Sequence, residues 1–410
     1  MLRLAVVFVS TIVVLSAIAV GGGCRRGGSA VQAGDPVADE PLTAVQIETV
    51  RTLSPLPEVP RDPTNAVSKD AGAAHLGRFL FFEQRLSADG SVSCASCHRP
   101  NHGFSVPTRV GHGLEKTPRH PPSLLNIAYH EWYDWDGKAD SVFGSLSDLS
   151  SKERFPPKAR PDPDDPESAA HRAWQSMAEA DRKTVNRVAS NMTKAIAAYE
   201  EKLVSGGAPF DRYVEGLETG DPAKLDALSP SAKRGLKLFV GEAQCINCHN
   251  GPALTDRAFH NLGLGPRPWL PDGDQGRWKG VPSVKSNTFN AAGAFSDAPE
   301  GKAADWVRYL KRTSEDHGQF KTPTLRNVEL TPPYMHGGHF STLEEVVRFY
   351  STLDEQPRVG HREEMLEPLG LSDREVDDLV AFLKSLTGRE VPAKLRRPPV
   401  SPVPEDGANQ

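Results

Sequence analysis

The 410-residue sequence lacks a second long hydrophobic run, an excess of basic residues and the arrangement of cysteines that a disulfide framework needs. After the apolar residues 4–20, no segment is apolar enough to span a bilayer. A formal net charge of −5 argues against a nucleic-acid-binding protein, which needs a concentrated basic face. Only five cysteines are present, and four of them form two C-x-x-C pairs, which argues against simple disulfide bridging. The length allows two domains, each with its own core.

The N-terminus has the pattern of an export signal. Arg3 precedes the apolar residues 4–20, and three glycines then precede Cys24. A charged start, a short apolar core and small residues are typical of a secretory signal, so we expect residues 1–24 to direct export to the periplasm. A membrane anchor is the alternative. Cys24 resembles the cysteine of a bacterial lipobox, although Gly21 stands where leucine is usual. We therefore expect lipidation of Cys24, with simple secretion as the alternative.

The rest of the chain divides by composition. Residues 25–60 are rich in Gly, Ala and Pro and predict a flexible tether. Two domains are expected over residues 61–220 and 221–395, joined near residues 206–222. Residues 396–410 form a Pro-rich tail.

Helical patterns support this division. Residues 71–82 and residues 169–203 have few helix breakers and apolar positions at helical spacing. The Pro/Asp-rich residues 156–166 predict an exposed loop. Ser372 and Glu375 form a capping box in front of the last helix.

An internal repeat connects the two halves. Residues 122–127 read Pro-Ser-Leu-Leu-Asn-Ile, and residues 323–328 read Pro-Thr-Leu-Arg-Asn-Val, a shift of 201 positions. Gly137 falls on Gly338 at the same shift. Each copy follows a C-x-x-C-H motif, so the repeat predicts a duplicated domain.

The two C-x-x-C-H motifs predict covalent attachment of haem. Their cysteines and histidines are Cys94, Cys97, His98, Cys245, Cys248 and His249. On one helical turn the two thiols project to the same side, where each can form a thioether with a haem vinyl group, and the histidine can ligate the iron. A disulfide, a zinc site built from both pairs and a thioredoxin-like redox pair are the alternatives. None of these explains a histidine after each of two pairs, so we expect two covalently bound c-type haems.

Ligands for the opposite faces of the haems are less evident from spacing. His112 lies between two glycines, which would give its loop freedom to move. Met335 lies in the segment Pro-Tyr-Met-His-Gly-Gly of the second repeat. A thioether ligand raises the potential of a haem, whereas most histidines and methionines are ordinary core or surface residues.

At these motifs the chain resembles the bacterial diheme cytochrome c peroxidase family, which includes the MauG-like enzymes. The similarity begins near residue 71 and covers most of the chain after it. Its landmarks are residues 76–82, 85–87, 111–113, 117–119, 135–140, 320–327 and 333–336. The resemblance implies a mainly α fold with two cytochrome c-like haem domains, whose haems face a shared interface.

The resemblance also implies a role for each site residue. His98 would be the proximal ligand of a peroxide-reactive haem, and His112 its displaceable distal ligand. His249 and Met335 would ligate a second haem of higher potential, which stores an electron. Trp135 would lie between the haems as an electron conduit.

Two features depart from the family. The family has an acidic residue near a Gln-Ala pair that moves the peroxide proton, and residues 141–155 lack this pair. Glu153 is the nearest candidate, with a solvated surface charge as the alternative. His120 stands where the family has an asparagine of its calcium site, and imidazole is a poor ligand for Ca²⁺. Bound calcium is therefore kept only as an alternative.

The predicted function is reduction of hydrogen peroxide to water with electrons from a small donor protein, a cytochrome c or a cupredoxin. A MauG-like oxidation of another substrate and a non-enzymatic diheme electron carrier are the alternatives, because the acidic segment is not recognisable. A homodimer is compatible with the resemblance.

Overall fold

The computed structural model describes residues 41–87, 89–146, 167, 169–270 and 273–403, and these residues are mainly helical. The α-helices are α1 (Ala44–Arg51), α2 (Ala71–Phe81), α3 (Cys94–Cys97), α4 (Val142–Leu146), α5 (Ala169–Ser176), α6 (Glu179–Glu200), α7 (Pro209–Thr219), α8 (Pro222–Leu225), α9 (Pro230–Val240), α10 (Arg277–Ser286), α11 (Lys302–Tyr309), α12 (Leu343–Thr352) and α13 (Asp373–Lys384). The 3-10 helices are η1 (Gln84–Leu86), η2 (Pro100–His102), η3 (Ile127–Tyr129), η4 (Cys245–Asn247), η5 (Ser314–Asp316), η6 (Val328–Leu330) and η7 (Ala393–Arg396). Strands β1 (Phe259–His260) and β2 (Phe320–Lys321) form an antiparallel pair. Within the described ranges, no helix is both long and apolar enough to cross a bilayer.

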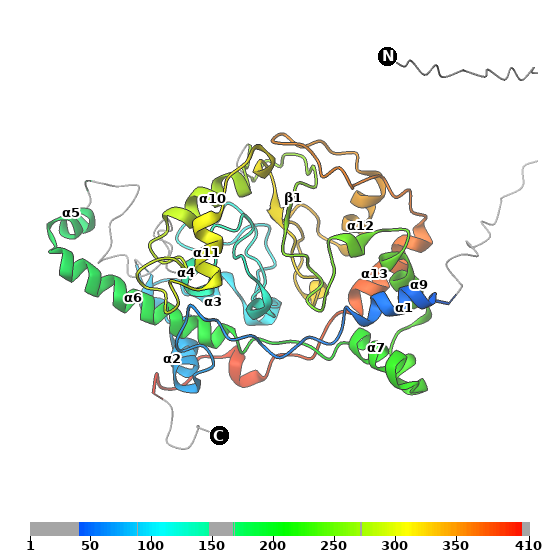
Figure 1. Ribbon diagram of the computed structural model, residues 1–410, viewed down its shortest axis with the longest axis horizontal. Coiled ribbons are helices and arrows are strands. Elements are labelled where there is room, and N and C mark those ends of the chain that lie inside the picture. Colours follow the sequence, from blue (N-terminus) through cyan, green and yellow to red (C-terminus); the bar gives the residue numbers. More distant parts are fainter. Residues whose placement is uncertain (1–40, 88, 147–166, 168, 271–272, 404–410) are drawn as a thin grey trace, which may run out of the picture. The chain divides into compact units, whose positions relative to one another are not determined.

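The first hydrophobic core is built on the crossing of α2 and α6 (Figure 1). The two helices touch through their backbones at Gly77, where an added Cβ would lie 1.8 Å from the carbonyl oxygen of Ala195. Asp70 caps α2 by accepting a hydrogen bond from the N–H of Ala73 at 2.6 Å. Phe81 packs on the ring of Tyr199 in this core, with centroids 5.2 Å apart.

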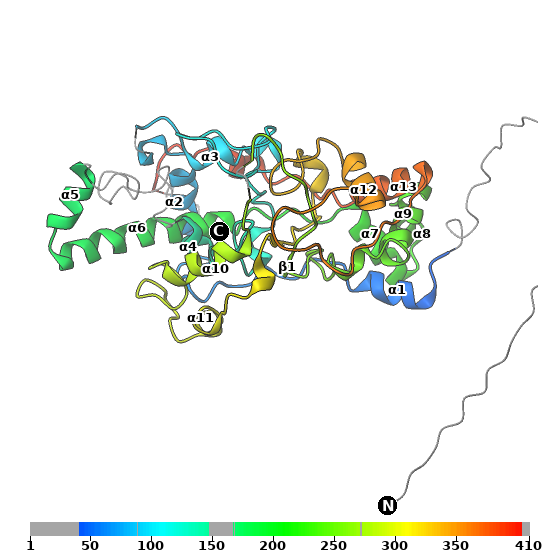
Figure 2. The same cartoon turned by 90° about the horizontal axis from the view of Figure 1, so that it is seen from above.

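The second core repeats this crossing with α9 and α13 (Figure 2). An added Cβ on Gly235 would lie 1.9 Å from the carbonyl oxygen of Asp378. The predicted capping box of α13 is confirmed: Ser372 N–H donates to Glu375 at 2.8 Å, and the hydroxyl oxygen of Ser372 accepts from Glu375 N–H. In each core, therefore, the helix that precedes a C-x-x-C-H motif packs closely against a later helix, and a glycine permits this close contact.

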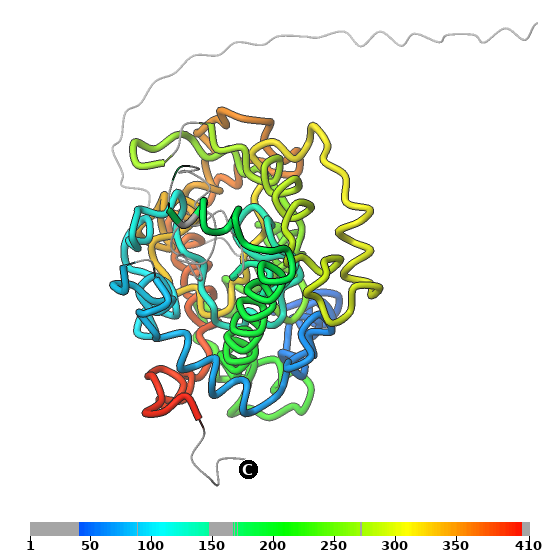
Figure 3. The backbone as a smooth tube through the Cα atoms, turned by 90° about the vertical axis from the view of Figure 1, so that its left-hand side faces the viewer, coloured from blue at the N-terminus to red at the C-terminus, as the bar shows by residue number. Residues whose placement is uncertain are grey.

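The predicted helices are confirmed with one break. The pattern over residues 71–82 corresponds to α2. The pattern over residues 169–203 corresponds to α5 and α6, which are separated at Met177 and Ala178. Helix α6 is the longest described helix and can be followed in green in Figure 3. The loop predicted over residues 156–166 lies outside the described residues.

The prediction of a flexible tether over residues 25–60 is wrong for its second half. Thr43 and Gln46 form a capping box that starts α1, and Val50 and Leu53 are fully buried in the second core. The apolar side chains that fix this segment are few and sit beside many small residues, so composition concealed them. The expected signal peptide and Cys24 lie outside the described residues.

The segment expected to connect the domains also contains a helix. Residues 209–219 form α7, and its Phe210 and Tyr213 are buried in the second core. The chain end folds back to the first core, because Tyr199 donates its hydroxyl to the carbonyl of Leu395 at 2.6 Å. Beyond it, the carbonyl of Ser401 lies 2.8 Å from the ring of His75 in α2.

The repeated segments adopt the same backbone geometry. Asn126 and Asn327 both have a left-handed φ of 62°, and they precede η3 and η6. Gly137 and Gly338 have φ of 61° and 60°. Left-handed backbone is costly for most residues other than glycine and asparagine, so these turns require the residue types that the repeat retains.

Candidate haem-binding site

The two C-x-x-C-H motifs share one backbone geometry. In each motif the histidine N–H donates to the carbonyl of the first cysteine at 2.9 Å, from His98 to Cys94 and from His249 to Cys245. This turn places the two cysteines of a motif together, as attachment to one haem requires. None of these four cysteines is in a disulfide, and all four are half-buried.

The histidines of both motifs are held in the tautomer that an iron ligand needs. Nδ1 of His98 donates to the carbonyl of Phe104 at 3.1 Å, and Nδ1 of His249 donates to the carbonyl of Leu254 at 3.1 Å. Because a carbonyl oxygen only accepts, Nδ1 carries the proton and the Nε2 lone pair stays available for a metal. Burial lowers the pKa of His249, which favours the neutral, ligating form.

The zinc alternative finds no support in the described part of the chain. Among the described residues, one group of His, Cys, Asp and Glu side chains has its ligand atoms within 4.8 Å of one another. This group consists of Cys248, Asp256 and His260. The two cysteine pairs therefore do not meet in a common metal cluster.

A cavity of about 590 Å³ adjoins the second motif, a size typical of cofactor sites. Its wall includes Cys245, Cys248 and His249 together with Met335. Apolar side chains form much of the remaining wall, namely Phe239, Leu264, Leu343, Val346, Val347, Leu379 and Leu383. A flat apolar macrocycle with one attachment edge fits such a wall.

Polar groups in the same wall indicate that a ligand belongs there. Nδ1 of His130 and Nδ1 of His339 are buried and have no hydrogen-bond partner among the described residues. Burial lowers the pKa of Lys321, which also lines the cavity, to about 8. Buried polar atoms without partners are costly in a protein that is complete without a ligand. Together with the thiols and the available Nε2, they show that these residues fit a haem.

Met335 lines this cavity in a strained backbone conformation. Its φ is 69°, in the left-handed region that non-glycine residues rarely adopt. Such strain persists where the surroundings fix it, and it is frequent at functional sites. The structure therefore brings Met335 and His249 to one cavity, as the sequence predicts for a ligand pair.

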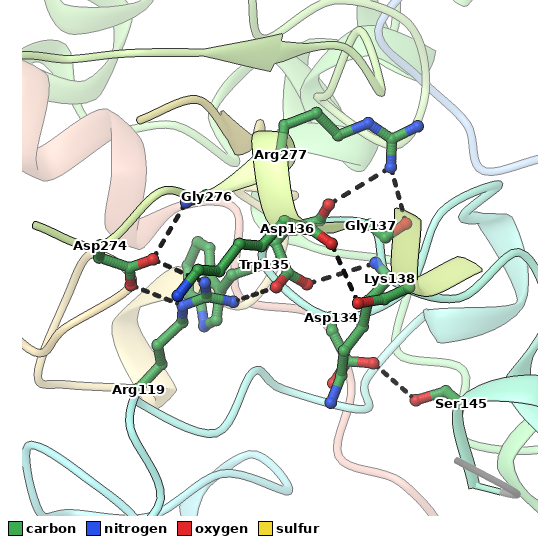
Figure 4. A network of polar contacts seen from close by, with 12 residues as sticks. Arg119, Asp134, Trp135, Asp136, Gly137, Lys138, Ser145, Asp274, Gly276 and Arg277 are labelled. Atoms are coloured by element: carbon green, nitrogen blue, oxygen red, sulfur yellow. Dashed lines mark hydrogen bonds and ion pairs between the residues drawn. The ribbon is translucent and has the colours of Figure 1, made fainter. Parts of the chain in front are cut away.

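Trp135 lines the same cavity and is fixed by hydrogen bonds. Its Nε1–H donates to the carbonyl of His120 at 2.7 Å. The next residue, Asp136, forms an ion pair with Arg119 at 2.7 Å, and Arg119 also binds Asp274 with two hydrogen bonds of 2.8 Å (Figure 4). These charges are largely buried, so the pairing holds the loop of Trp135 in place.

A second guanidinium supports the same loop from the other side. Arg277 donates to the carbonyl of Gly137 at 2.6 Å (Figure 4). Its guanidinium carbon also lies 4.4 Å from the ring of Trp132 and 4.1 Å from the ring of Phe259. The residue is buried, and an added Cβ on Gly137 would collide with it.

His112 is placed differently from these residues. Its side chain is exposed, and it is not part of the cavity wall. The loop is closed at its base, where Gly111 N–H donates to the Thr117 hydroxyl at 2.7 Å and Thr117 N–H donates back to the carbonyl of Gly111 at 3.0 Å. Glu153 lies outside the described residues.

Some charged groups at the cavity were not predicted from the sequence. His260 lies between two carboxylates, with Nε2 2.8 Å from Asp256 and Nδ1 2.7 Å from Glu363. The hydrogen bond with Asp256 is the main cause that raises the pKa of His260 to about 11, so the ring is an imidazolium at neutral pH. Asp274, the partner of Arg119, is equally unmarked. The His260–Glu363 and Arg119–Asp274 pairs join residues more than 100 positions apart, so no local motif reports them. Asp256 lies only four positions before His260.

The side chain of His120 does not fit the role of a calcium ligand. It is buried, its Nδ1 lies 3.1 Å from the carbonyl of Thr108, and its Nε2 lies 3.0 Å from the hydroxyl of Ser105. Burial lowers the pKa of His120 to about 4, so the ring is neutral at pH 7. Both ring nitrogens are already used within the protein, and imidazole suits Ca²⁺ poorly.

Comparison with known proteins gives matches to di-haem cytochrome c peroxidases and to MauG proteins. The family described as di-haem cytochrome c peroxidase matches residues 71–219. Cytochrome-c peroxidase IdrP1 of Denitromonas iodatirespirans is 34% identical over 360 residues, covering 82% of this chain and 87% of that protein. Methylamine utilization protein MauG of Methylorubrum extorquens is 34% identical over 341 residues, covering 80% and 81%. The crystal structure of a MauG-like protein associated with microbial copper homeostasis superposes with a TM-score of 0.59 at 25% identity, covering 84% of this chain and 98% of that one.

Proposed function

Because this chain belongs to the di-haem cytochrome c peroxidase family, we propose that it reduces hydrogen peroxide to water with electrons from a small donor protein, a cytochrome c or a cupredoxin. The chain is an oxidoreductase, and the family implies two c-type haems. Two electrons and two protons convert each peroxide into two water molecules. The observation that carries the proposal is the single cavity that holds Cys245, Cys248, His249 and Met335.

Residues of the second half would hold the electron-storing haem. Cys245 and Cys248 would attach it, and His249 and Met335 would supply ligands to its iron. A thioether ligand favours the reduced metal, so this site has the higher potential of the two.

Residues of the first half would form the peroxide site. Cys94 and Cys97 attach the haem and His98 ligates its iron, with Nδ1 fixed by the carbonyl of Phe104. When bound, the two haems store electrons and reduce the O–O bond. His112 would supply a further, displaceable ligand to the same site. Its exposed side chain between two glycines gives it room to swing.

Trp135 would connect the two sites. It lines the cavity at the second motif, and its indole N–H donates to the carbonyl of His120. The N–H of His120 in turn donates to the carbonyl of His336 at 2.8 Å. His336 follows Met335 directly. An aromatic ring in this position shortens the path that an electron must cross.

The chain must also deliver protons to the peroxide. Breaking the O–O bond moves a proton from one oxygen to the other, a step that a nearby carboxyl group catalyses. We assign this step to Glu153. Glu153→Gln should lower the rate of peroxide turnover and leave both haem spectra unchanged, and normal turnover by this variant would remove Glu153 from the mechanism.

The remaining assignments follow from the sequence. The matched turns at Asn126 and Asn327 support two haem domains that arose by duplication, with their haems near a shared interface. The charged, apolar and small-residue pattern of residues 1–24 supports export to the periplasm, with lipidation at Cys24. A homodimer is part of the same proposal, and calcium is not.

Steady-state turnover of hydrogen peroxide with a reduced cytochrome c tests the proposed function. Peroxide-dependent oxidation of the donor, increased by pre-reduction of one haem, is expected. MauG-like chemistry, which the 34% identity to a MauG keeps as the second candidate, predicts peroxide consumption with poor oxidation of the donor. A mere electron carrier would exchange electrons with the donor and leave peroxide unreacted.

A further inference from the structure

The backbone of His120 joins the two ends of the proposed electron path through its N–H and its carbonyl. Its carbonyl accepts the indole N–H of Trp135 at 2.7 Å, and its N–H donates to the carbonyl of His336 at 2.8 Å. His336 is bonded covalently to Met335. The backbone of His120 and two hydrogen bonds therefore connect Trp135 with the residue next to the ligand of the second haem.

The side chain of His120 extends the same connection toward the first haem site. Its Nε2 lies 3.0 Å from the hydroxyl of Ser105, and that hydroxyl lies 2.6 Å from the carbonyl of Pro121. Ser105 directly follows Phe104, whose carbonyl fixes Nδ1 of His98. The segment that orients the first proximal histidine is thus tied to the segment that meets the second haem site.

His336, at the second-site end of this connection, is held by aromatic contacts. The ring of His336 stacks on Phe320, with centroids 3.6 Å apart and planes inclined by 10°. The same ring meets Trp135 edge-on at 6.5 Å. His120 is only 4% exposed, so solvent cannot replace its contacts without opening the interface.

We propose that His120 is a positioning residue for electron transfer between the two haem sites. Its buried imidazole holds the linking peptide with protein contacts alone, so that the link needs no divalent cation. This inference rests on the proposed function only in assuming that both sites hold haem and that Trp135 lies on the path. It does not require peroxide turnover.

The test is the rate at which an electron redistributes between the haems after rapid photoreduction of the oxidised holoprotein. The wild-type rate should be the same in EGTA and in millimolar calcium. His120→Ala should slow it by about tenfold, because loss of the side chain lets the peptide move by a fraction of an ångström or more. The midpoint potentials of both haems should stay unchanged, since no ligand is lost. His102→Ala, an exposed histidine in the neighbouring η2, is the matched control and should keep the wild-type rate.

Three results would overturn the inference: a wild-type rate that falls in EGTA and recovers with calcium, a wild-type rate in His120→Ala, or shifted potentials that show a general disturbance of the haem sites. If His120→Ala does not fold, Ser105→Ala removes the Nε2 contact together with the hydrogen bond from the Ser105 hydroxyl to the carbonyl of Pro121, and it should slow the transfer in the same direction. A wild-type protein that transfers electrons normally but does not consume peroxide would refute the proposed function and leave this inference intact.

Discussion

Asp134 and Met335 occupy matching backbone positions 201 residues apart, with left-handed φ values of 60° and 69°. Tyr133 and Tyr334 precede them, and each tyrosine donates its N–H to the carbonyl six residues further on, at 2.9 and 2.8 Å. The two halves therefore present different side chains at the end of the same turn. A thioether stands in the second half and a carboxylate in the first.

This difference explains how one scaffold can give two unlike haem sites. The Asp134 carboxylate accepts the hydroxyl of Ser145 at 2.8 Å and offers no soft ligand to iron (Figure 4). If the halves arose by duplication, the position that supplies the Met335 ligand in the second half carries Asp134 in the first half, which is unsuited to bind the iron of the first site. A ligand for the first site must come from another segment, and a loop such as that of His112 can both supply and withdraw it.

Replacing Met335 by histidine should lower the potential of one haem only. An imidazole stabilises ferrous iron less than a thioether does, so the higher of the two potentials should fall toward the lower one. Redox titration followed by visible spectroscopy measures this. Met365→His is the matched control, because Met365 lines the same cavity but is half-exposed, and it should change neither potential. Two indistinguishable haems in the wild type would contradict the assignment of Met335.

Covalent attachment at both motifs predicts two c-type haems per chain in a pyridine haemochrome assay. The double variant Cys94→Ala, Cys97→Ala should retain one, and the double variant Cys245→Ala, Cys248→Ala should retain the other. Haem that acid acetone extracts from the wild type would exclude thioether bonds.

The helix crossing of the first core can be tested at one glycine. Gly77→Ala would place a methyl group 1.8 Å from the carbonyl of Ala195, so α2 must move from α6 at a cost of about 1–3 kcal/mol of unfolding free energy. Gly72→Ala lies in the same helix and meets only the Asp70 side chain, at 3.3 Å. It should be neutral or raise stability by up to about 1 kcal/mol. Thermal unfolding of the two variants compares them directly, and equal midpoints would argue against the close crossing.

Local patterns in the sequence predicted the elements that local chemistry determines. The C-x-x-C-H turns, α2 and the capping box of α13 depend on residues a few positions apart, and all three were predicted correctly. Helix α1 was missed although Thr43 and Gln46 form a capping box at its start, because the composition around it is that of a tether and its Val50 is buried against a distant part of the chain.

In the candidate site, too, the sequence predicted some residues and missed the tertiary contacts that hold them. The repeat and the resemblance drew attention to Trp135 and Met335, which the structure places at one cavity. The contacts that hold them there come from Asp274 and the peptide of His120, which are remote or belong to the backbone. Such partners are set by the tertiary fold, and no spacing rule in one sequence reveals them.

Asp140 should make stability depend on pH. Burial is the main cause that raises its pKa from 3.8 to about 6, and its Oδ1 has no hydrogen-bond partner among the described residues. The folded protein holds this proton more tightly than the unfolded chain, so stability is lost as pH rises from about 4 through 6. Asp140→Asn stays neutral and can still accept from Ala291 N–H, as Asp140 does at 2.7 Å.

The gain in unfolding free energy of Asp140→Asn over the wild type should therefore be larger at pH 7.5 than at pH 4.5, by on the order of 1 kcal/mol. Chemical denaturation at the two pH values measures the difference. Asp226→Asn, at a side chain that is 82% exposed, is the control and should show no such trend. A gain that is independent of pH would show that Asp140 does not titrate in this range.

His112 is predicted to gate the first haem. A haem with ligands on both faces cannot bind peroxide, so one ligand must leave before the reaction. The oxidised wild type should show two six-coordinate low-spin haems by electron paramagnetic resonance, and half-reduction should produce a high-spin signal. His112→Gly removes the ligand but keeps the loop, whose base is closed by Gly111 and Thr117. This variant should be high-spin without reduction and should react with peroxide at once.

The matched control for the gate is His102→Gly, at an exposed histidine that follows the same haem motif. It should keep the low-spin spectrum of the wild type. If His112 only packs in its loop, both variants will be low-spin when oxidised, and the exposed position of the His112 side chain will then describe its permanent state. If the His112 variant alone becomes high-spin, the imidazole must reach the iron in the oxidised holoprotein. The exposed position would then correspond to the open gate, with the glycines on either side of His112 permitting the movement between the two.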